Sequence, residues 1–434
     1  MKTKLWEKEN STTPQWLMDF TAGNDQLLDL ELAEFDVTGS LAHAEMLSKV
    51  GLLSADEFTA LEKELKEIAV IIRKGGFIIE EGVEDVHSQV EILLTRKLGD
   101  VGKKIHSARS RNDQVLTDIK LYSLAQLKKT SLLVGELFNL LQKKSEEYKA
   151  ILIPGYTHLQ AAMPSSFGLW FGAYAESLCD DMELVIAAYN VANKNPLGSG
   201  AGYGGSLPIN RTLTTELMHF EGMNYNVVYA QMTRGKSEKI TATALASIAA
   251  TLSKLAMDIC LYNSQNFGFV SFPDALTTGS SIMPHKKNPD VFELIRGKCN
   301  RLQALPNEFT LLLSNLPSGY HRDLQLTKEM LFPAFRELQA CLQASVNMLK
   351  EIHVNESSVK EEKYKFIFSV EAVNQLVTEG LSFREAYQKV GADIASTTFE
   401  FTKEIHHTHE GSIHNLCNKE IAERFSILSD KILK

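Results

Sequence analysis

The sequence lacks the paired cysteines that would staple a small secreted domain or hold a zinc ion. Its 434 residues include only five cysteines, which lie far apart and form no Cys-x-x-Cys pair. Disulfide-rich domains and cysteine-based zinc sites both need closely spaced cysteines. We therefore expect reduced thiols in a cytosolic protein and no metal site of this kind.

Positive charge is also in short supply. There are 45 lysines and arginines against 54 aspartates and glutamates, which gives a net charge of −9. Proteins that bind nucleic acids by electrostatics need a basic surface. We therefore expect no nucleic-acid partner, although local cations could still hold an anionic small molecule.

Long apolar runs are scarce as well. The longest, around residues 242–261, is interrupted by two serines, Lys254 and Asp258. This composition predicts a run too polar to span a bilayer. Residues 1–10, MKTKLWEKEN, lack the apolar core of a signal peptide. The sequence thus predicts a soluble cytoplasmic protein with no membrane partner.

Proline is missing from three long stretches, where helices can therefore be long. None of the eleven prolines lies between Pro14 and Pro154, between Pro208 and Pro273, or after Pro333. Proline breaks helix interiors, so these gaps favour a mainly α fold.

Local patterns place several helices in those gaps. Ser54–Glu57 is a capping box, followed by apolar residues three or four apart until Gly75. Longer helices are predicted from Asp113 to about Tyr148 and from about Val228 to Asn263. The last is apolar on all sides, which is typical of a helix buried in a core or between subunits.

The remaining patterns complete a three-part organisation. Ser382–Glu385 is a second capping box, and the β-branched segment Phe77–Ile79 could form a minor hairpin. We predict a small helical domain over residues 1–108, a central bundle of long helices over 109–353, and a small helical domain over 354–434.

The segment with the most reactive and charged side chains is the loop Gly279–Asp290, with the sequence GSSIMPHKKNPD. Its glycine and serines can move, and Lys286 and Lys287 can hold a carboxylate. Asn288 followed by Pro289 is typical of a helix cap and first helical position. The alternative is a flexible surface connection with solvated lysines. Glu293 then lies one turn into the helix, where the dipole alone could explain a carboxylate.

Three other segments gather polar groups. Glu84–His87 and Ser107–Gln114 combine arginines, hydroxyls and amides that could grip a carboxylate; alternatively, Asn112 or Asp113 simply caps a helix. Pro154–Gln160 sets His158 beside Thr157 on a turn, where the histidine could transfer a proton or be a hydrogen-bonded structural residue.

The last polar segment is Tyr320–Lys328, in which Gln325 and Lys328 would share one face of a helix or turn. The alternative here is a solvated helical face. The glycine-rich stretch 198–205 lacks a preceding strand, so we reject a dinucleotide-binding loop there.

Together these segments resemble the argininosuccinate lyase family of the fumarase/aspartase superfamily. The Gly279–Asp290 loop is similar to the superfamily's signature, and Ser107–Gln114 contains the narrower family's SRNDQ sequence. The other similar segments follow in the family's order: Asp36–Ala44, Glu84–His87, Gly155–Gln160 and Tyr320–Lys328. The resemblance covers roughly residues 20–330 and fades in the tail.

The resemblance implies a homotetramer whose central bundle is built from four subunits and whose active sites each draw on three chains. The implied reaction is the reversible cleavage of argininosuccinate into arginine and fumarate, a step of arginine biosynthesis. It implies no metal and no organic cofactor.

The resemblance also implies roles for residues. Ser280 would be the base, helped by Lys286 and by loop N–H groups, and Lys286 with Asn288 would stabilise the carbanion. His158, paired with Glu293, would transfer a proton or orient another group. The implied substrate-binding residues are Asp85, His87, Arg111, Asn112, Thr157, Asn288, Tyr320, Arg322, Gln325 and Lys328.

Several positions depart from the family pattern. His285 stands where glutamine is more common, and Phe20–Asp25 lacks a serine that many members use. Met232–Lys236 replaces an acidic segment, and Leu207–Arg211 keeps only the outline of its counterpart. These departures concern substrate contacts at the amino-acid end, not the elimination machinery.

Two other readings stay open at this point. The chain could be another fumarate-releasing lyase of the superfamily, such as adenylosuccinate lyase, fumarase or aspartase. It could also be an inactive structural protein related to eye-lens crystallins, since one fold can serve many functions. The presence of His158, Ser280 and Lys286 favours an enzyme.

Overall fold

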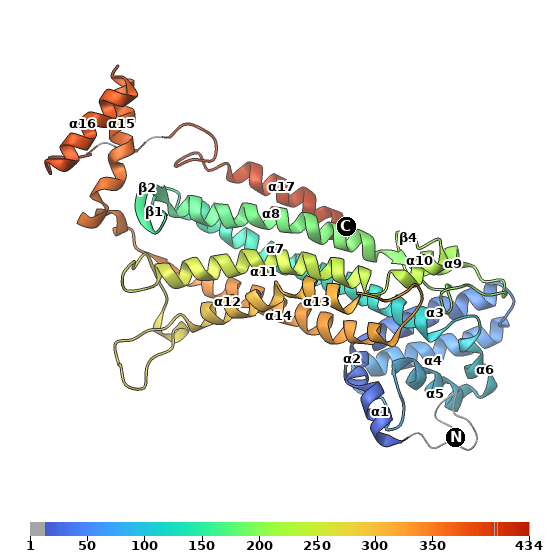
Figure 1. Ribbon diagram of the computed structural model, residues 1–434. Coiled ribbons are helices and arrows are strands. Elements are labelled where there is room, and N and C mark those ends of the chain that lie inside the picture. The colour runs from blue at the N-terminus through green and yellow to red at the C-terminus, as the bar shows by residue number, and fades with distance from the viewer. Residues whose placement is uncertain (1–13, 403, 406, 434) are drawn as a thin grey trace. The chain divides into compact units, whose positions relative to one another are not determined.

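Helices make up most of the chain, as the proline gaps predict (Figure 1). A computed structural model describes residues 14–402, 404–405 and 407–433. Residues 1–10, for which we expect no signal peptide, lie outside that range. The chain divides into two compact units: the first holds Leu184–Ala246, Gln303–Arg336 and the described residues up to Thr130, and the second holds the rest.

Four long helices have residues in both units. They are α7 (Arg111–Glu147), α8 (Phe167–Ala192), α11 (Lys236–Tyr262) and α14 (Thr327–Lys350). The predicted helix from Asp113 to about Tyr148 is thereby confirmed as α7. The mainly α class with long central helices is confirmed as well, while the three-domain boundaries stay a prediction.

The first unit surrounds the buried ring of Tyr122. Its ring centroid lies 4.1 Å from that of Phe332, and Phe35 and Phe335 meet it edge-on. The unit's other elements are α1 (Gln15–Ala22), α2 (Asp25–Asp29), η1 (Leu30–Leu32), α3 (Ala33–Lys49), α4 (Ala55–Arg73), α5 (Val86–Leu98), α6 (Asp100–Lys103), η2 (Lys104–His106), β3 (Lys194–Asn195), α9 (Arg211–Leu217), β4 (Gly222–Met223), α10 (Val227–Met232), α13 (Leu305–Leu312) and η4 (Arg322–Leu326).

The second unit contains a hairpin, an aromatic cluster and the C-terminal helices. Helix α17 (Asn418–Leu433) runs beside α8, with Arg424 paired to Asp180 at 2.7 Å (Figure 1). The other elements are β1 (Leu152–Thr157), β2 (Gln160–Ser166), β5 (Val270–Ser271), η3 (Asp274–Leu276), α12 (Asp290–Leu302), β6 (His353–Val354), η5 (Ser358–Lys360), η6 (Glu362–Phe368), α15 (Ser369–Thr378) and α16 (Phe383–Ala395).

Both predicted capping boxes are present. The Ser54 and Ser382 hydroxyls each accept a hydrogen bond from the backbone N–H three residues later in the chain. The Glu57 and Glu385 carboxylates in turn accept the backbone N–H of these serines. These reciprocal bonds satisfy N–H groups that a helix start leaves unpaired, so α4 and α16 begin where the sequence predicts.

Three predicted details are wrong. The segment Phe77–Ile79 forms no strand; Glu80, next to it, donates its N–H to the Gln89 side chain instead. The predicted helix from about Val228 is broken into α10 and α11 by Gly235, whose φ of +80° ends the first helix. A Cβ there would also lie 2.2 Å from a Leu313 methyl group.

The third wrong detail concerns the start of α12. This helix begins at Asp290, one residue after the proline that we expect at its first position. The Pro289 carbonyl accepts the first helical N–H groups, those of Phe292 at 2.9 Å and Glu293 at 3.1 Å, so Pro289 and not Asn288 stands at the cap position. The Asn288 N–H donates to the Thr278 carbonyl at 2.8 Å and closes the base of the loop.

Helix α11 corrects one further expectation. With 27 residues and a mean hydropathy of 1.5 in its most apolar window, it is long and apolar enough to cross a membrane. The expectation that its composition excludes a membrane span is therefore wrong. Half of that apolar window is nevertheless buried within the chain. Its Asp258 accepts hydrogen bonds from Trp170 at 3.0 Å and Tyr174 at 2.6 Å. These contacts are typical of a helix packed in a protein core.

Candidate functional site

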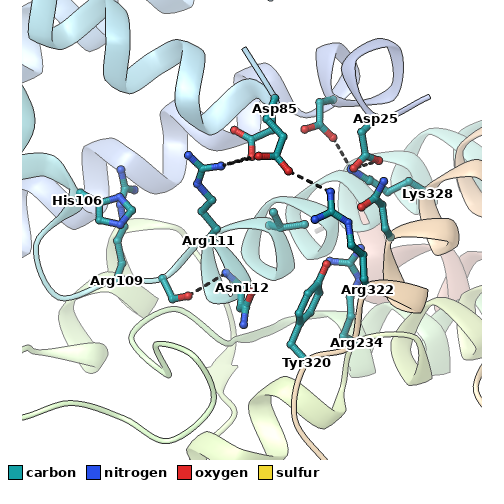
Figure 2. Close-up of a pocket in the computed structure, with 15 residues that line it drawn as sticks. Asp25, Asp85, His106, Arg109, Arg111, Asn112, Arg234, Tyr320, Arg322 and Lys328 are labelled. Carbon is teal, nitrogen blue, oxygen red and sulfur yellow. Dashed lines mark hydrogen bonds and ion pairs between the residues drawn. The ribbon is translucent and has the colours of Figure 1, made fainter. Parts of the chain in front are cut away.

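A polar pocket of about 490 Å³ lies within the first unit (Figure 2). Charged side chains dominate its lining, with arginines and a lysine facing carboxylates. Seven of the predicted substrate-binding residues line it: Asp85, Arg111, Asn112, Tyr320, Arg322, Gln325 and Lys328.

Asp85 joins the starts of two helices at this pocket. As the cap of α5 it accepts bonds from the Ser88 N–H at 2.8 Å and hydroxyl at 2.6 Å, while its other oxygen pairs with Arg111 at 2.9 Å (Figure 2). Burial disfavours the charged carboxylate, but His87 and Arg111 outweigh it and hold the pKa of Asp85 below its usual value. The Arg111 guanidinium is thus fixed at the pocket wall.

The start of α7 is held by Ser110 and Asp113 rather than by Asn112. The Ser110 hydroxyl accepts the Asn112 N–H at 3.3 Å, and Asp113 accepts the Ser110 N–H at 2.9 Å. The second Asp113 oxygen binds the N–H groups of Gly198 and Gly200 at 2.9 and 2.8 Å. The glycine-rich stretch is therefore an anchor for this helix, and the Asn112 side chain is left to line the pocket.

The opposite wall comes from η4 and the first turn of α14. Arg322 pairs with Glu84 at 3.1 Å, and both Arg322 and Gln325 donate to the Thr21 carbonyl at 2.9 Å. Lys328 lies between Asp25 and Asp29 at 2.7 and 2.6 Å. Gln325 and Lys328 do face the same pocket, as their spacing predicts.

His87 does not line the pocket. It is buried, and its Nδ1 lies 2.8 Å from Asp36 and 3.5 Å from Asp118. Burial alone would lower the pKa of His87, but the carboxylates of Asp36, Asp118 and Asp85 outweigh it and raise the pKa to about 9. The imidazole is therefore a cation at neutral pH that braces α5 against α3 and α7.

Among the described residues, one group of three could offer metal ligands: Asp36, His87 and Asp118. A protonated imidazole has no lone pair to give to a metal. The buried guanidinium of Arg109, 3.0 Å from the Ser40 hydroxyl, adds a second cation that stabilises ionised Asp36. Burial, together with the neighbouring Asp36, raises the pKa of Asp118 well above its usual value. Two cations beside these carboxyl groups indicate a buried ion-pair cluster more than a metal centre.

The raised pKa of His87 predicts a loss of stability in alkali. Because this pKa exceeds its ordinary 6.5, the stabilisation is complete below about pH 6.5 and is lost as the pH rises through about 9. We expect the free energy of unfolding to fall by on the order of 2 kcal/mol between pH 7 and pH 9.5. Urea unfolding of the chain and of its His87→Gln variant checks this. Equal losses in both proteins would contradict it.

The second unit carries the other predicted residues, beginning with the turn between β1 and β2. His158 and Leu159 both have left-handed backbones, with φ of 53° and 58°. Such turns favour asparagine and glycine, and bulky residues are strained there by about 1–3 kcal/mol each. Thr157 and His158 are both exposed. Within the described residues no hydrogen bond holds the His158 imidazole, which argues against a hydrogen-bonded structural histidine.

The loop between η3 and α12 presents Ser280 with its hydroxyl already in contact with backbone donors. The N–H groups of Met283 and Ile282 lie 3.2 and 3.4 Å from Ser280 Oγ. Lys287 pairs with Asp274. Among the described residues Lys286 makes no ion pair, and it is exposed.

Glu293 lies in the first turn of α12, as predicted. Within the part of the chain that the structure describes, no hydrogen bond or ion pair joins His158 to Glu293. Their pairing therefore stays a prediction.

The pocket also contains residues beyond the predicted substrate-binding set: Asp25, Asp29, Glu84, His106, Arg109, Ser110, Val115 and Arg234. Arg234 belongs to the segment Met232–Lys236, which departs from the family pattern. That departure was the only feature of the sequence that drew attention to Arg234. Its buried guanidinium contacts Glu238 at 3.1 Å and the Leu324 carbonyl at 2.9 Å. Asp25 likewise ends the divergent segment Phe20–Asp25, whereas nothing local to Asp29 pointed to this pocket.

Comparison with known proteins gives one consistent picture. A family model described as Lyase matches residues 8–304. The argininosuccinate lyase of Bacteroides fragilis is 60% identical over 422 residues, covering 97% of this chain and 94% of that protein. The argininosuccinate lyase of Thermotoga neapolitana is 37% identical over 390 residues, covering 90% and 98%.

Solved structures share the fold. A crystal structure of EDDS lyase in complex with formate has a TM-score of 0.78 at 20% identity, covering 97% of this chain and 91% of that one. A class II fumarase from Schistosoma mansoni has a TM-score of 0.72 at 16% identity, covering 96% and 94%.

Proposed function

Because the chain belongs to the argininosuccinate lyase family of the fumarase/aspartase superfamily, we propose that it catalyses the reversible cleavage of argininosuccinate into L-arginine and fumarate. The observation that carries this proposal is 60% identity over nearly the full length. That identity favours this reaction over those of adenylosuccinate lyase, fumarase or aspartase, and over an inactive crystallin-like role. The reaction would serve arginine biosynthesis.

Ser280 would take the proton from the carbon beside the succinyl carboxylate. A serine hydroxyl is a weak base, so its alkoxide needs stabilisation. The two backbone N–H groups of Ile282 and Met283 that approach Ser280 Oγ support this role, because they would hydrogen-bond the alkoxide.

Loss of that proton leaves an electron pair that spreads onto the neighbouring carboxylate, giving a dianionic aci-form. Lys286 and Asn288 would stabilise this charge as it develops. The exposure of Lys286, and the engagement of Lys287 by Asp274, support Lys286 as the cation for this task. The electron pair then forms the double bond of fumarate, and the C–N bond breaks.

The departing nitrogen takes the bonding pair and needs a proton. His158, oriented by Glu293, would supply or relay it. The strained turn that carries His158 supports a functional role, because strained backbone is often found at active sites.

The first unit's pocket would hold the rest of the substrate. Arg111 and Arg322 would contact carboxylates, with Asn112, Tyr320 and Gln325 as hydrogen-bond partners. Asp85 and His87 would position these groups rather than react, and Thr157 would contribute from the hairpin.

We further propose a cytoplasmic homotetramer in which segments from different chains complete each active site. The exposure of Thr157, His158 and Lys286 supports this assembly, because each is open to a partner chain. No nucleic-acid or membrane partner and no cofactor enter the proposal. The division into 1–108, 109–353 and 354–434 remains our domain proposal.

Fumarate release tests the function. Ultraviolet detection should show fumarate from argininosuccinate and none from adenylosuccinate, malate or aspartate offered in parallel. Fumarate from one of these instead would move the chain to another reaction of the superfamily. No product from any, with the protein folded, would favour a structural role.

A further inference from the structure

Two arginines on opposite walls of the pocket approach the same carboxylate. Arg111 at the start of α7 and Arg322 in η4 both point toward the carboxyl groups beside Asp85 (Figure 2). One of these is the carboxylate of Glu84, which also lines the pocket. One Glu84 oxygen lies 3.1 Å from Arg322 Nη2, and the other lies 3.7 Å from Arg111 Nη1. Glu84 therefore links the two walls.

The two arginines differ in how firmly they are held. Arg111 is 29% exposed and has Asp85 as its nearer partner, at 2.9 Å. Arg322 is 53% exposed, and among the described residues Glu84 is the only carboxylate that pairs with it. The other hydrogen bond of Arg322 in that part of the chain goes to the Thr21 carbonyl at 2.9 Å. Arg322 is thus the arginine whose position depends on Glu84.

The guanidinium of Arg322 is held by one nitrogen and has others to offer. Its bonds to Glu84 and to the Thr21 carbonyl both use Nη2. Within the described residues nothing pairs with Nη1 or Nε of Arg322, so these N–H groups can donate to a ligand. Because a guanidinium is a rigid planar fork, fixing one nitrogen restricts the directions of the others. Glu84 thereby helps to set where the free donors of Arg322 point.

Asp85, the next residue in the chain, cannot take the place of Glu84. One Asp85 oxygen accepts the N–H and the hydroxyl of Ser88, and the other pairs with Arg111. The two neighbouring carboxylates therefore have different tasks. Asp85 holds Arg111 at one wall, and Glu84 holds Arg322 at the other.

The Glu84–Arg322 pair is too open to solvent to matter much for folding. Exposed ion pairs contribute little to stability, because water competes with them and long side chains lose freedom in forming them. A side chain that is already held in its binding conformation, in contrast, need not be ordered when the ligand arrives. We therefore expect the pair to affect the affinity for a ligand more than the free energy of unfolding.

We propose that Glu84 is a positioning residue, which holds Arg322 so that the free N–H groups of its guanidinium face a carboxylate of the substrate. The inference rests on the proposed function, in which Arg322 contacts the substrate. Glu84 acts through Arg322 rather than on the substrate. Its removal should therefore matter only while Arg322 is present.

A double-mutant cycle tests this dependence. Calorimetry would measure the Kd of argininosuccinate for four proteins that all carry Ser280→Ala to prevent turnover: the parent, Glu84→Gln, Arg322→Gln and the double variant. Glu84→Gln should raise Kd about fivefold to tenfold, the effect of having to order one flexible side chain. Arg322→Gln should raise Kd about tenfold to a hundredfold, the effect of losing a hydrogen bond to a charged group. The double variant should match Arg322→Gln within about twofold.

Two further measurements separate positioning from a structural role. With Ser280 intact, Glu84→Gln should raise KM and keep kcat within about threefold, as expected for lost binding that is equal in the ground and transition states. Its urea unfolding midpoint should equal that of the parent. Glu80→Gln is the matched control, because Glu80 forms a similarly exposed ion pair with Arg96 and does not line the pocket. It should leave Kd unchanged.

Several results would overturn the assignment. If the effects of Glu84→Gln and Arg322→Gln multiply in the double variant, Glu84 does not act through Arg322. A lower Kd for Glu84→Gln would mean that Glu84 repels the substrate, and a parent that binds no argininosuccinate would remove the ligand altogether. The proposed function fails separately, if the wild-type chain releases no fumarate, because binding in the Ser280→Ala background needs no turnover.

Discussion

Replacing Ser280 by alanine lowers kcat by about a thousandfold if this residue is the base, within the range that general acid–base groups contribute. The substitution removes the hydroxyl that the N–H groups of Ile282 and Met283 approach. It leaves those donors in place. We expect KM for argininosuccinate to change little, because Ser280 acts on a proton that is transferred only in the reaction. Steady-state fumarate release measures both constants.

Ser281 provides the matched control in the same loop. Ser281→Ala deletes an identical group one residue away and should keep kcat within about tenfold of the wild-type value. A Ser280→Ala enzyme that turns over nearly normally would remove Ser280 from the role of base. A large loss in Ser281→Ala with little in Ser280→Ala would assign that role to the neighbour.

Lys286→Met lowers kcat/KM by about a hundredfold to a thousandfold, the effect of removing one group that stabilises charge in a transition state. Methionine keeps much of the length of the side chain but carries no charge. The loss should appear mainly in kcat, because the second negative charge on the carboxylate exists only after the proton has left. The same fumarate assay measures it.

Lys287→Met is the corresponding control. Lys287 is engaged by Asp274 on the neighbouring 3-10 turn, so its removal should cost less than about tenfold in kcat/KM. Equal effects of the two substitutions would mean that the loop contributes general positive charge and that no single lysine is aligned with the substrate.

The sequence predicted the start of a helix where the residues that cap it lie within a few positions of one another. The capping boxes at Ser54 and Ser382 satisfy N–H groups within four residues, so they are readable from the sequence. The break at Gly235 was not predicted, because its neighbours are compatible with a helix. That break depends on a positive φ and on the nearby Leu313 side chain.

The pocket was predicted only where motifs supplied its residues. Asp29 and Lys328 are 299 positions apart, and neither position predicts the other. Arg234 lines the same pocket from a segment that first appeared only as a departure. The left-handed turn at His158 and Leu159 also escaped prediction, since it lacks the asparagine and glycine that usually mark it.

The turn that carries His158 depends on the C-terminal part of the chain, which contains none of the predicted site residues. The Tyr156 hydroxyl donates to that of Tyr364 in η6 at 2.9 Å, and Ser358 in η5 reaches the Leu152 carbonyl at 3.4 Å. The C-terminal segment thus braces the hairpin from outside. A chain that ended before Tyr364 would keep every motif residue and lose the support that holds a strained turn in shape. The C-terminal segment, although it contains none of the predicted site residues, therefore helps to hold His158 in position.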